Sequence, residues 1–408
     1  MKIAIFTNEF PPNIYGGAGV HVDFLSLQLS KLAKVEVRCF GDQHYQDHNL
    51  NVLGIDSALN QPDQQDNNHL KMFHNLSRNV EMSQHLLSAD VVHCHTWYTH
   101  LAGIFTKQLL QIPLILTTHS LEAHRPWKFE QLGNGYFLSK YIEQQAYSAA
   151  DGVIAVSQQM KNDVVEAYSI DPEKVSVIHN GIDPEFYKPT FNNDFLASYE
   201  IDFKIPIVLF VGRITRQKGI SQLIGAAKHF DKNCQIVLCA GAPDTPEIAA
   251  ETSRLVAELQ ESRKGVFLIS EMLPREKIKI LYSHATVFVC PSLYEPFGII
   301  NLEALSCETA VVASHVGGIP EIISEAETGF LIPLECVSRT DFNPKNPDEF
   351  QTNIAYKVNF LLQNPQIAKE MGQKGREIVL QKFSWTSIAK TTLAFYQNRI
   401  DNFKKQTI

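Results

Sequence analysis

Short apolar runs alternate along the whole chain with longer stretches in which apolar residues recur at helical spacing. The runs are rich in β-branched residues and are bounded by Gly, Asn or Pro, which predicts buried strands. Strands that alternate with helices predict parallel sheets covered by helices on both faces. In the first half we predict strands at residues 2–8, 35–40, 90–95, 114–119, 152–157 and 175–181, enough for one doubly wound domain.

The segment between the first two predicted strands shows the helical pattern most clearly. Its apolar residues recur every three or four positions, which predicts a helix with one face packed on the sheet. The residues of this stripe are Val20, Val22, Phe24, Leu25, Leu27, Leu29 and Leu32.

The alternation stops at residues 183–205, which hold two prolines and an Asn-Asn-Asp cluster without clear periodicity, as is typical of a linker. Ser384 is a candidate N-cap for a last helix that could dock on the first domain. We therefore expect an α/β protein with two Rossmann-like domains facing each other across a cleft, at 1–190 and 191–383, and a C-terminal helix at 384–408. Beyond the linker, strands are predicted at 206–212, 235–241, 265–270, 286–290, 309–314 and 328–333, with helices that include 246–262 and 274–283.

Composition supports this reading, because 408 residues and 46.0 kDa suit two domains. A net charge of −8 without a basic patch argues against a nucleic-acid partner. The seven cysteines are an odd number and mostly lie in apolar runs, so we expect buried thiols in a reducing compartment. The first apolar run is too short for a signal peptide, and no stretch approaches 18 apolar residues, so we expect a cytosolic protein without stable membrane insertion.

Two carboxylates, Glu295 and Glu303, frame the segment EPFGIINLE just after a predicted strand. If a helix begins near Gly298, the two side chains lie roughly 10 Å apart along the chain path. A retaining glycosidase with a covalent intermediate needs carboxyls only about 5 to 5.5 Å apart. The pair is therefore better explained as two separate contacts to one elongated ligand, although a polar loop before a core helix gives the same pattern.

A glycine-rich loop, NEFPPNIYGGAGVH at 8–21, connects the first strand to the first helix. Gly16, Gly17 and Gly19 permit close backbone approach, and a helix N-terminus favours an anion such as phosphate. The loop is neither GxGxxG nor GxxxxGK[ST], which argues against dinucleotide and P-loop sites. A phosphate or sugar contact and a tight structural turn both remain open.

Two cations, Arg213 and Lys218, follow the first strand of the second half in VGRITRQKG. A guanidinium and an ammonium at a strand end can neutralise a diphosphate and the charge that it gains as a leaving group. Ordinary surface cations are the alternative, and Arg216 is the member expected to be solvated.

Further candidates lie at other strand ends, where open α/β sheets bind their ligands. His119 ends the strand LILTTH and could contact a sugar hydroxyl, although a lone histidine is more often structural. His93, His95 and His100 suggest zinc at first sight, but no carboxylate completes a tetrahedral set, so we expect no metal site. Ligand contacts and tight turns are equally open for Asn180 and Gly181 in HNGID and for Gly317, Gly318, Pro320 and Glu321 in VGGIPE.

Taken together, GGAGVH, THS, HNGID, VGRITRQKG, EPFGIINLE and VGGIPE occur in the order found in retaining glycosyltransferases of family GT4, which have the GT-B fold. The resemblance covers essentially the whole chain. It is closer still to the short actinobacterial-type glycogen synthases, which include the maltose-1-phosphate synthases, through long matches such as VFVCPSLYEPFGIINLEA and HSLEAHRPWKFEQLG.

The resemblance implies a role for each candidate residue. Glu295 and His119 would contact the transferred glucose, and Glu303 would hold the ribose of a nucleotide. Arg213 and Lys218 would bind the diphosphate. The further donor contacts implied are Gly16, Gly17, Gly298, Ile299 and Asn180.

The resemblance also implies a reaction: transfer of glucose, with retained configuration and without a metal, from a nucleotide sugar such as ADP-glucose. The product is an α-1,4 bond on an α-glucan or on glucose 1-phosphate. One departure is that Ile14-Tyr15 stands where the longer glycogen synthases have a Lys before their paired glycines. Alternatives are another donor and acceptor pair, such as a UDP-sugar with a sucrose-type or lipid-linked acceptor, or a non-catalytic sugar-nucleotide-binding protein.

Overall fold

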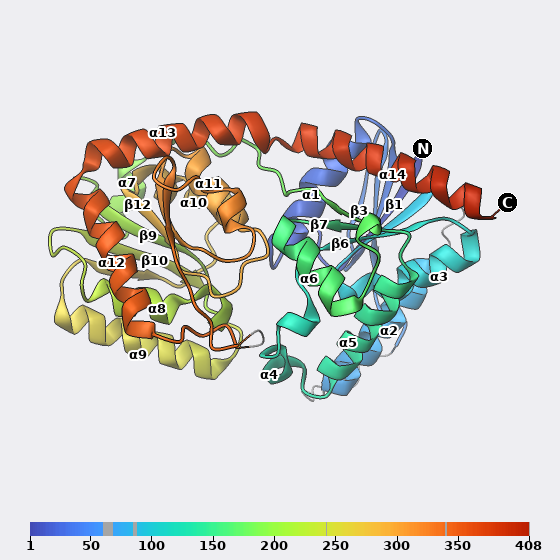
Figure 1. The fold of residues 1–408 in the computed structure, drawn as a ribbon, viewed down its shortest axis with the longest axis horizontal. Coiled ribbons are helices and arrows are strands. Elements are labelled where there is room, and N and C mark those ends of the chain that lie inside the picture. The colour runs from blue at the N-terminus through green and yellow to red at the C-terminus, as the bar shows by residue number, and fades with distance from the viewer. Residues whose placement is uncertain (60–67, 85–87, 242, 339–340, 408) are drawn as a thin grey trace. The chain divides into compact units, whose positions relative to one another are not determined.

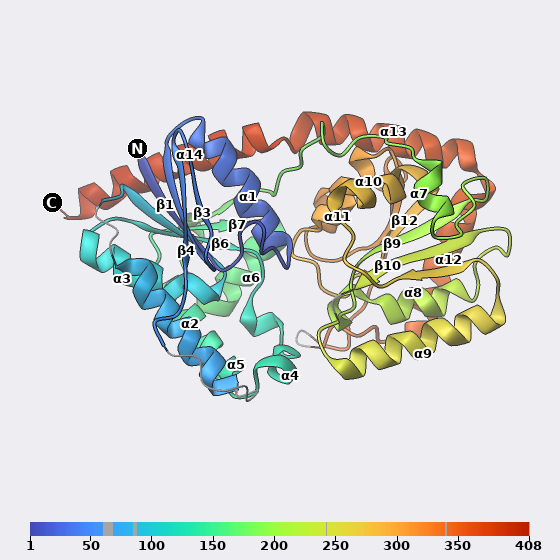
Figure 2. The same cartoon turned by 180° about the vertical axis from the view of Figure 1, so that it is seen from behind.

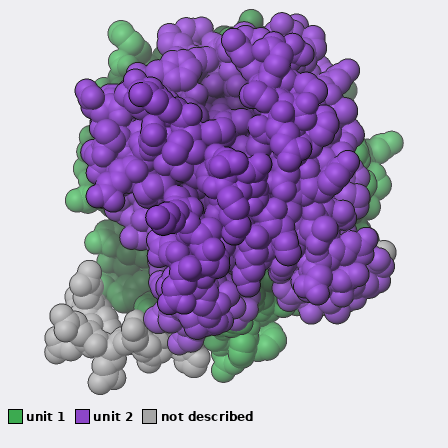
Figure 3. Space-filling view, turned by 90° about the vertical axis from the view of Figure 1, so that its left-hand side faces the viewer, with its two compact units in different colours: residues 1–181, 385–408 green, residues 182–384 purple. Residues whose placement is uncertain are grey.

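The computed structural model describes residues 1–59, 68–84, 88–241, 243–338 and 341–407. Within these ranges the chain forms two compact units. The first comprises Met1–Gly181 together with Trp385–Ile408, and the second is the continuous segment Ile182–Ser384. Figure 3 colours the first unit green and the second purple.

The described part of the first unit contains a sheet of order β3-β4-β2-β1-β5-β6-β7-β8, in which every pairing except β3 with β4 is parallel. The order reverses between β1 and β5, which is the switch point of a doubly wound sheet. All six strands predicted in this half are confirmed. The strands are β1 (Lys2–Thr7), β2 (Lys34–Phe40), β3 (His44–Asp47), β4 (Leu50–Ile55), β5 (Val91–His95), β6 (Leu114–Thr118), β7 (Gly152–Ala155) and β8 (Val175–Val177).

The prediction of six strands was wrong in missing β3 and β4. All four residues of β3, the sequence HYQD, are exposed, so this strand has no apolar face to mark it. It is an antiparallel edge strand, and such a strand is held by backbone hydrogen bonds to one neighbour only. Apolar periodicity cannot detect a strand of this kind.

Helices cover both faces of this sheet (Figures 1 and 2). On one face, α1 and α14 bury Leu25, Leu29 and Tyr396 against strand residues such as Ile5 and Val37. The opposite face carries α2, α3 and α5. The helices are α1 (Gly17–Ser30), α2 (Asn68–Ser83), α3 (His100–Leu110), α4 (Lys128–Leu132), α5 (Gly135–Ala149), α6 (Gln158–Tyr168) and α14 (Trp385–Thr407), with short 3₁₀ turns η1 (Trp97–Thr99), η2 (Glu122–His124) and η3 (Pro172–Lys174).

The apolar stripe predicted for α1 is only partly confirmed. Val22, Leu25 and Leu29 are buried, whereas Leu27 is 42% and Leu32 46% exposed. The helix ends at Ser30, so Leu32 lies beyond it, and Leu27 lies off the buried stripe of i, i+3 and i+7 positions.

The second unit has a parallel sheet of order β11-β10-β9-β12-β13-β14, and all six strands predicted here are confirmed. Numbered within the unit this is 3-2-1-4-5-6, the doubly wound order, with its switch point between β9 and β12. The predicted fold class of two doubly wound sheets is therefore confirmed. The strands are β9 (Ile207–Arg213), β10 (Gln235–Gly241), β11 (Val266–Ile269), β12 (Val287–Cys290), β13 (Ala310–Ser314) and β14 (Gly329–Ile332).

One face of this sheet packs on α8, α9 and α12 around buried residues such as Phe210, Leu223 and Val358, and α10 and α11 lie on the other face (Figure 1). The predicted helix at 246–262 is confirmed, and the one predicted at 274–283 lies one residue later. The helices are α7 (Asn193–Ala197), α8 (Ile220–Ala227), α9 (Pro246–Ser262), α10 (Arg275–His284), α11 (Ile299–Ser306), α12 (Pro347–Gln363) and α13 (Pro365–Lys382), with 3₁₀ turns η4 (Arg216–Lys218) and η5 (Ile319–Glu321).

Six of the seven cysteines are buried and Cys336 is partly exposed, and none forms a disulfide in the structure. Their prediction as buried thiols is thus confirmed except at Cys336. Among the described residues, the helices are too short or too polar for any of them to cross a lipid bilayer.

Candidate active site

The switch point of the second sheet gathers the candidate residues of that unit. Arg213 is the last residue of β9, and Lys218 closes the 3₁₀ turn that follows it. Glu295 lies in the loop after β12, the neighbouring strand. Loops at the carboxyl ends of two adjacent strands meet here, as the binding crevice of an open α/β sheet requires.

Lys218 and Glu295 form a buried ion pair across this switch point. The Lys218 ammonium donates a hydrogen bond to Glu295 Oε2 at 2.6 Å, and Ser292 Oγ donates to the same oxygen at 3.1 Å. The two charged side chains are only 18% and 8% exposed. Such a pair holds a fixed positive and a fixed negative group side by side in a region of low dielectric constant, where both act strongly on a charged ligand.

Two glycines let the chain bring these charges together. Gly219 has φ +64°, and a Cβ there would lie 2.0 Å from the carbonyl oxygen of Pro291. Gly317 has φ +54°, and its Cβ would lie 1.8 Å from the carbonyl oxygen of Glu295. The backbone of the VGGIPE motif therefore passes close to the backbone of Glu295. The Gly318 amide donates a hydrogen bond to the Glu295 carbonyl oxygen at 3.1 Å.

Gly219→Ala is expected to lower both stability and turnover, because the added methyl must push η4, with Lys218, away from the loop that carries Glu295. Misplacing a charged group in this way should cost about 10- to 100-fold in kcat. Gly265→Ala is the matched control, since Gly265 also has a left-handed φ of +73° but its Cβ would meet nothing closer than 3.4 Å. The control should lose about 1 to 2 kcal/mol of stability and keep its turnover, as measured by urea unfolding and initial rates. Equal turnover in both variants would contradict the proposed displacement.

Arg213, the second candidate cation, pairs with a different carboxylate. Its Nη1 lies 3.5 Å from Oδ1 of Asp244 in the loop after β10, and its side chain is 24% exposed. Arg216 is exposed, as predicted for the solvated member of this loop. The strand end thus offers two cations that are each already held by an acidic partner.

The helix α11 begins as predicted, with Gly298 as its N-cap at φ +102° and Ile299 as its first residue. Glu303 lies on this helix and is 9% exposed, and its Oε2 accepts a hydrogen bond from the Tyr282 hydroxyl at 3.0 Å. Burial raises the pKa of the Glu303 carboxyl, and hydrogen bonds from Tyr187 and Tyr282 oppose that shift. Glu295 and Glu303 therefore lie in different surroundings, one beside an ammonium and the other between two phenols.

In the first unit, the glycine-rich loop is held by a carboxylate of the chain itself. Glu9 Oε2 accepts hydrogen bonds from the backbone amides of Tyr15 at 2.9 Å and Gly16 at 2.7 Å. Gly17 is the first residue of α1. A Cβ on Gly19 would lie 2.9 Å from Glu9 Oε2, so this glycine makes room for the carboxylate. The sequence left a phosphate or sugar contact and a tight structural turn both open for this loop, and the contact of the Glu9 carboxylate with its amides was missed.

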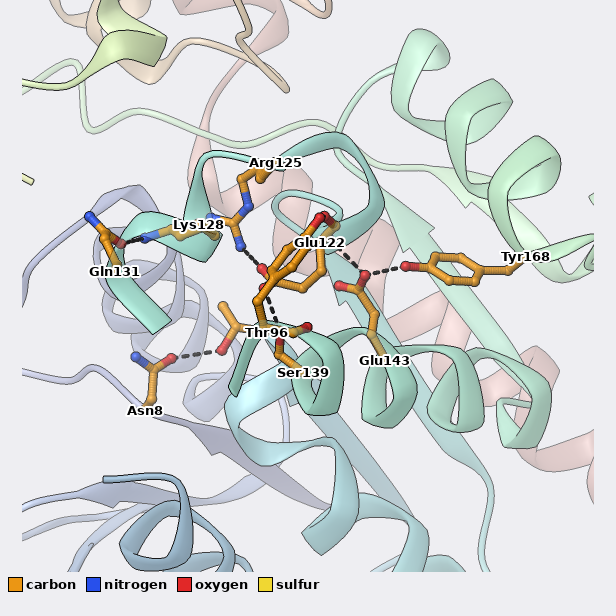
Figure 4. A network of polar contacts seen from close by, with 10 residues as sticks. Asn8, Thr96, Glu122, Arg125, Lys128, Gln131, Ser139, Glu143 and Tyr168 are labelled. Carbon is orange, nitrogen blue, oxygen red and sulfur yellow. Dashed lines mark hydrogen bonds and ion pairs between the residues drawn. The ribbon is translucent and has the colours of Figure 1, made fainter. Parts of the chain in front are cut away.

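The switch point of the first sheet carries a backbone outlier. Thr96 directly follows β5 and has φ 65°, a value that is rare for a β-branched residue and costs on the order of 1 to 3 kcal/mol. Its Oγ1 donates to Asn8 Oδ1, which follows β1, at 2.7 Å (Figure 4). Strain of this kind is kept where the surrounding structure fixes a functional geometry.

Several histidines form a cluster next to this switch point. His95 Nδ1 lies 2.9 Å from His119 Nε2, and the rings of His21 and His119 are 4.8 Å apart between centroids. Asn180, at the end of the first unit's sheet, is 4% exposed and its Oδ1 lies 2.6 Å from His21 Nδ1. His93 Nε2 contacts Thr117 Oγ1, and its Nδ1 contacts the hydroxyl of Tyr396 in α14, both at 2.6 Å.

One ring nitrogen from each of His21, His95 and His119 lies within 4.8 Å of the others, which is near enough for a shared ligand. From the sequence we considered His93, His95 and His100 as metal ligands. The set of His21, His95 and His119 was missed because His21 lies on a helix that is far from the other two in the sequence. The hydrogen bond between His95 and His119 already uses one nitrogen of each. The absence of a metal site stays a prediction.

Comparison with known proteins assigns both units to glycosyltransferase families. The family model described as "Glycosyltransferase Family 4" matches residues 15–186, and the model "Glycosyl transferases group 1" matches residues 192–378. An "Alpha-maltose-1-phosphate synthase" of Mycolicibacterium smegmatis is 46% identical over 405 residues, covering 97% of this chain and 99% of that one. The chain belongs to glycosyltransferase family 4.

A further relative and a solved structure are also similar to this chain. A "D-inositol 3-phosphate glycosyltransferase" of Corynebacterium glutamicum is 29% identical, and the match covers 77% of this chain and 73% of the relative's chain. The sucrose-phosphate synthase of Thermosynechococcus elongatus superposes with a TM-score of 0.77 at 23% identity, covering 97% and 98% of the two chains. The protein is therefore a family 4 hexosyltransferase with the GT-B fold.

In this family 4 glycosyltransferase, the loop after β6 is braced by two buried carboxylates that the sequence did not single out (Figure 4). Glu122 accepts from Ser139 Oγ at 2.8 Å and pairs with Arg125. Glu143 accepts from the Glu122 backbone amide at 2.8 Å and from the Tyr168 hydroxyl. Glu122 follows His119 by three residues, so this network fixes the segment that carries His119.

The stability of this family 4 glycosyltransferase should depend on pH through Glu143. Burial, together with the nearby Glu122, raises the pKa of the Glu143 carboxyl to about 8 from its usual 4.5. Between these values the folded chain holds a proton that the unfolded chain has released. The free energy of unfolding should therefore fall as the pH rises from about 4.5 to 8, by up to about 1.4 kcal/mol per pH unit.

Glu143→Gln removes this titration and should flatten that slope in urea unfolding followed between pH 5 and 8. The matched control is Glu173→Gln, which changes an exposed carboxyl of the same unit and should leave the slope as in the parent. A slope that Glu143→Gln leaves unchanged would refute the assignment.

Proposed function

We propose that this enzyme transfers glucose from ADP-glucose to glucose 1-phosphate and so forms α-maltose 1-phosphate with an α-1,4 bond. The observation that carries the proposal is the 46% identity to an "Alpha-maltose-1-phosphate synthase" across nearly the whole of both chains. Candidate donor contacts at the strand ends of the second unit, and His119 at a strand end of the first, support it.

A phosphate-bearing acceptor is favoured over an α-glucan by the names of the relatives. One relative is named for a product that carries a phosphate, maltose 1-phosphate, and the other for a polyol phosphate, inositol 3-phosphate. An α-glucan acceptor is the second candidate, because the sequence motifs also resemble those of glycogen synthases.

The geometry suggests how the charges would serve the transfer. Lys218 and Arg213 would neutralise the diphosphate as the bond from its oxygen to glucose C1 breaks, which is where negative charge develops. Glu295 and His119 would hold the glucose, and Glu303 the ribose, with Gly16, Gly17, Gly298, Ile299 and Asn180 as further donor contacts.

The acceptor 4-hydroxyl oxygen would form its bond to C1 on the same face, and its proton would pass to the departing phosphate. This route retains configuration without an enzyme nucleophile, and it suits a Glu295 whose carboxylate is already engaged by an ammonium.

The experiment that tests the proposal is a matrix of two donors, ADP-glucose and UDP-glucose, against two acceptors, glucose 1-phosphate and maltoheptaose. Release of nucleoside diphosphate and the mass of the product are measured for each pair. We expect a disaccharide phosphate from ADP-glucose and glucose 1-phosphate at a kcat/KM well above that of the other three pairs. Elongation of maltoheptaose alone would support the glucan candidate, and tight ADP binding without turnover in any pair would support a non-catalytic protein.

We further propose that turnover needs no bound metal, since the charge on the diphosphate would be met by Lys218 and Arg213. Dialysis against EDTA should leave kcat within about twofold of the untreated enzyme, because the side chains already supply the charge that a metal provides in other transferases. Loss of activity on chelation, with recovery when a divalent cation is added back, would contradict this proposal.

A further inference from the structure

The hydrogen bond between His95 and His119 joins a fully buried ring to a partly exposed one. His95 is 0% exposed and lies on β5, whereas His119 follows β6 directly and is partly exposed. Their nitrogens, His95 Nδ1 and His119 Nε2, are 2.9 Å apart. His119 Nδ1 is therefore the nitrogen left for a ligand.

Both rings are neutral in the folded protein. Burial lowers the pKa of His95 and of His119 well below the usual 6.5, and the neighbouring imidazoles lower each pKa further. Among the described residues, the groups that act on the pKa of His95 electrostatically are the imidazoles of His21, His93, His100 and His119, and none of these is a carboxylate that would favour a charged ring. A neutral imidazole carries one N–H and one lone pair, so each ring must be in one of two tautomers.

The two possible directions of the hydrogen bond differ in what they leave at His95 Nε2. This nitrogen is buried and has no hydrogen-bond partner among the described residues. If His119 donated, His95 would carry its proton on Nε2, as a buried N–H without an acceptor. If His95 donates from Nδ1, its Nε2 is a buried lone pair instead. Orphaned buried N–H groups are rarer than under-satisfied acceptors, so the second direction is favoured.

His21 shows the same pattern in the same cluster. Its Nδ1 lies 2.6 Å from Asn180 Oδ1, an oxygen that can only accept, so His21 donates from Nδ1. Its Nε2 is then a buried lone pair, again without a partner in the described part of the chain. Two neighbouring rings are thus both consistent with protonation on Nδ1.

We propose that His95 is a positioning residue that donates from Nδ1 to His119 Nε2 and thereby keeps His119 protonated on Nδ1. His119 then presents an N–H, and not a lone pair, to its ligand. If the proposed function is correct, on which this part of the inference rests, His119 Nδ1 donates to an oxygen of the transferred sugar.

The direct test reads the tautomer itself. Enzyme labelled with ¹⁵N-histidine and freed of metals by chelation is examined by long-range ¹H–¹⁵N correlation at pH 8, with His119 assigned from the signal lost in His119→Asn. We expect the signature of a proton on Nδ1 in the wild-type protein, and a mixture of tautomers in His95→Phe. A wild-type His119 protonated on Nε2 would overturn the proposal, whatever the enzyme's activity.

Three variants carry the test to kinetics. His95→Asn keeps an N–H at the place of Nδ1, so its kcat should stay near that of the wild type and its His119 should keep the Nδ1–H signature. His95→Phe has no donor and should lose about 10- to 100-fold in kcat, with a smaller change in the KM for the donor. His100→Phe is the control for exchanging a buried imidazole for a phenyl ring, because neither nitrogen of His100 has a hydrogen-bond partner in the described residues, and it should keep its activity.

The outcomes separate the inference from the proposed function. If no donor and acceptor pair reacts but His119 is protonated on Nδ1 in a His95-dependent way, the proposed function fails and the assignment to His95 stands. If the enzyme is active and His95→Phe matches His95→Asn in both kcat and spectrum, the role of His95 is refuted.

Discussion

Glu295→Gln should lower kcat by about 10²- to 10³-fold while the protein stays folded. The substitution keeps the size of the side chain but removes the negative charge with which Glu295 would hold the glucose in the proposed reaction. It also replaces the carboxylate oxygen that accepts from Lys218 at 2.6 Å and Ser292 at 3.1 Å with a neutral amide oxygen, which accepts a weaker bond from an ammonium. Initial rates with ADP-glucose and glucose 1-phosphate measure the loss.

The matched control for this variant is Glu258→Gln. Glu258 also forms an ion pair with a cation, Arg254, but both side chains are exposed on α9, so its loss should change neither rate nor stability measurably. A Glu295→Gln enzyme with kcat within threefold of the wild type would refute the role of the carboxylate.

Lys218→Ala should be about as damaging to turnover, at about 10³-fold, and it should also destabilise the second unit. The first effect follows if the ammonium neutralises the leaving diphosphate. The second follows because Glu295 is left as a buried carboxylate without its counter-charge, which costs about 3 kcal/mol or more. Rates and urea unfolding measure the two effects separately.

The double variant Lys218→Ala/Glu295→Gln distinguishes the two effects. With the unpaired charge removed, much of the lost stability should return, whereas turnover should stay as low as in the single variants. Lys374→Ala is the control, because Lys374 pairs with Glu377 at 2.9 Å on the exposed surface of α13. A double variant no more stable than Lys218→Ala would show that the buried pair is not what links these residues.

Much of the second unit could be predicted from the sequence because its signals are local. Its strands are mostly continuous apolar runs. In β10, for example, all seven residues are buried, so the sequence pattern shows both that a strand is present and where it lies. The glycine that follows a predicted strand also indicated where α11 begins, and Gly298 is the N-cap of that helix. Local pattern could place Lys218 and Glu295 at strand ends, but their contact joins residues 77 positions apart and depends on which strands are neighbours.

The features that the sequence missed depend on such distant neighbours. His21, in the first turns of α1, joins the cluster only because the fold brings its ring to 5.3 Å from that of His95 and 4.8 Å from that of His119, and Asn180 contacts His21 across 159 positions. Glu9 was treated as part of a polar loop, since nothing in the loop shows that its carboxylate turns back to the amides of Tyr15 and Gly16. Glu143 lies within an amphipathic helix, and only the fold reveals that it is buried beside Glu122.

The two ends of the second unit lie next to each other. Its first residue, Ile182, donates a backbone hydrogen bond to the Phe383 carbonyl at 2.8 Å and forms a bridge with Ser384, its last residue. The segment 182–384 is therefore a continuous insertion into the first unit. It follows the loop after β8 and precedes α14. A chimera that exchanges this one segment between two family members would transfer the whole second unit through two neighbouring joints, and α14 would stay with the sheet on which it packs.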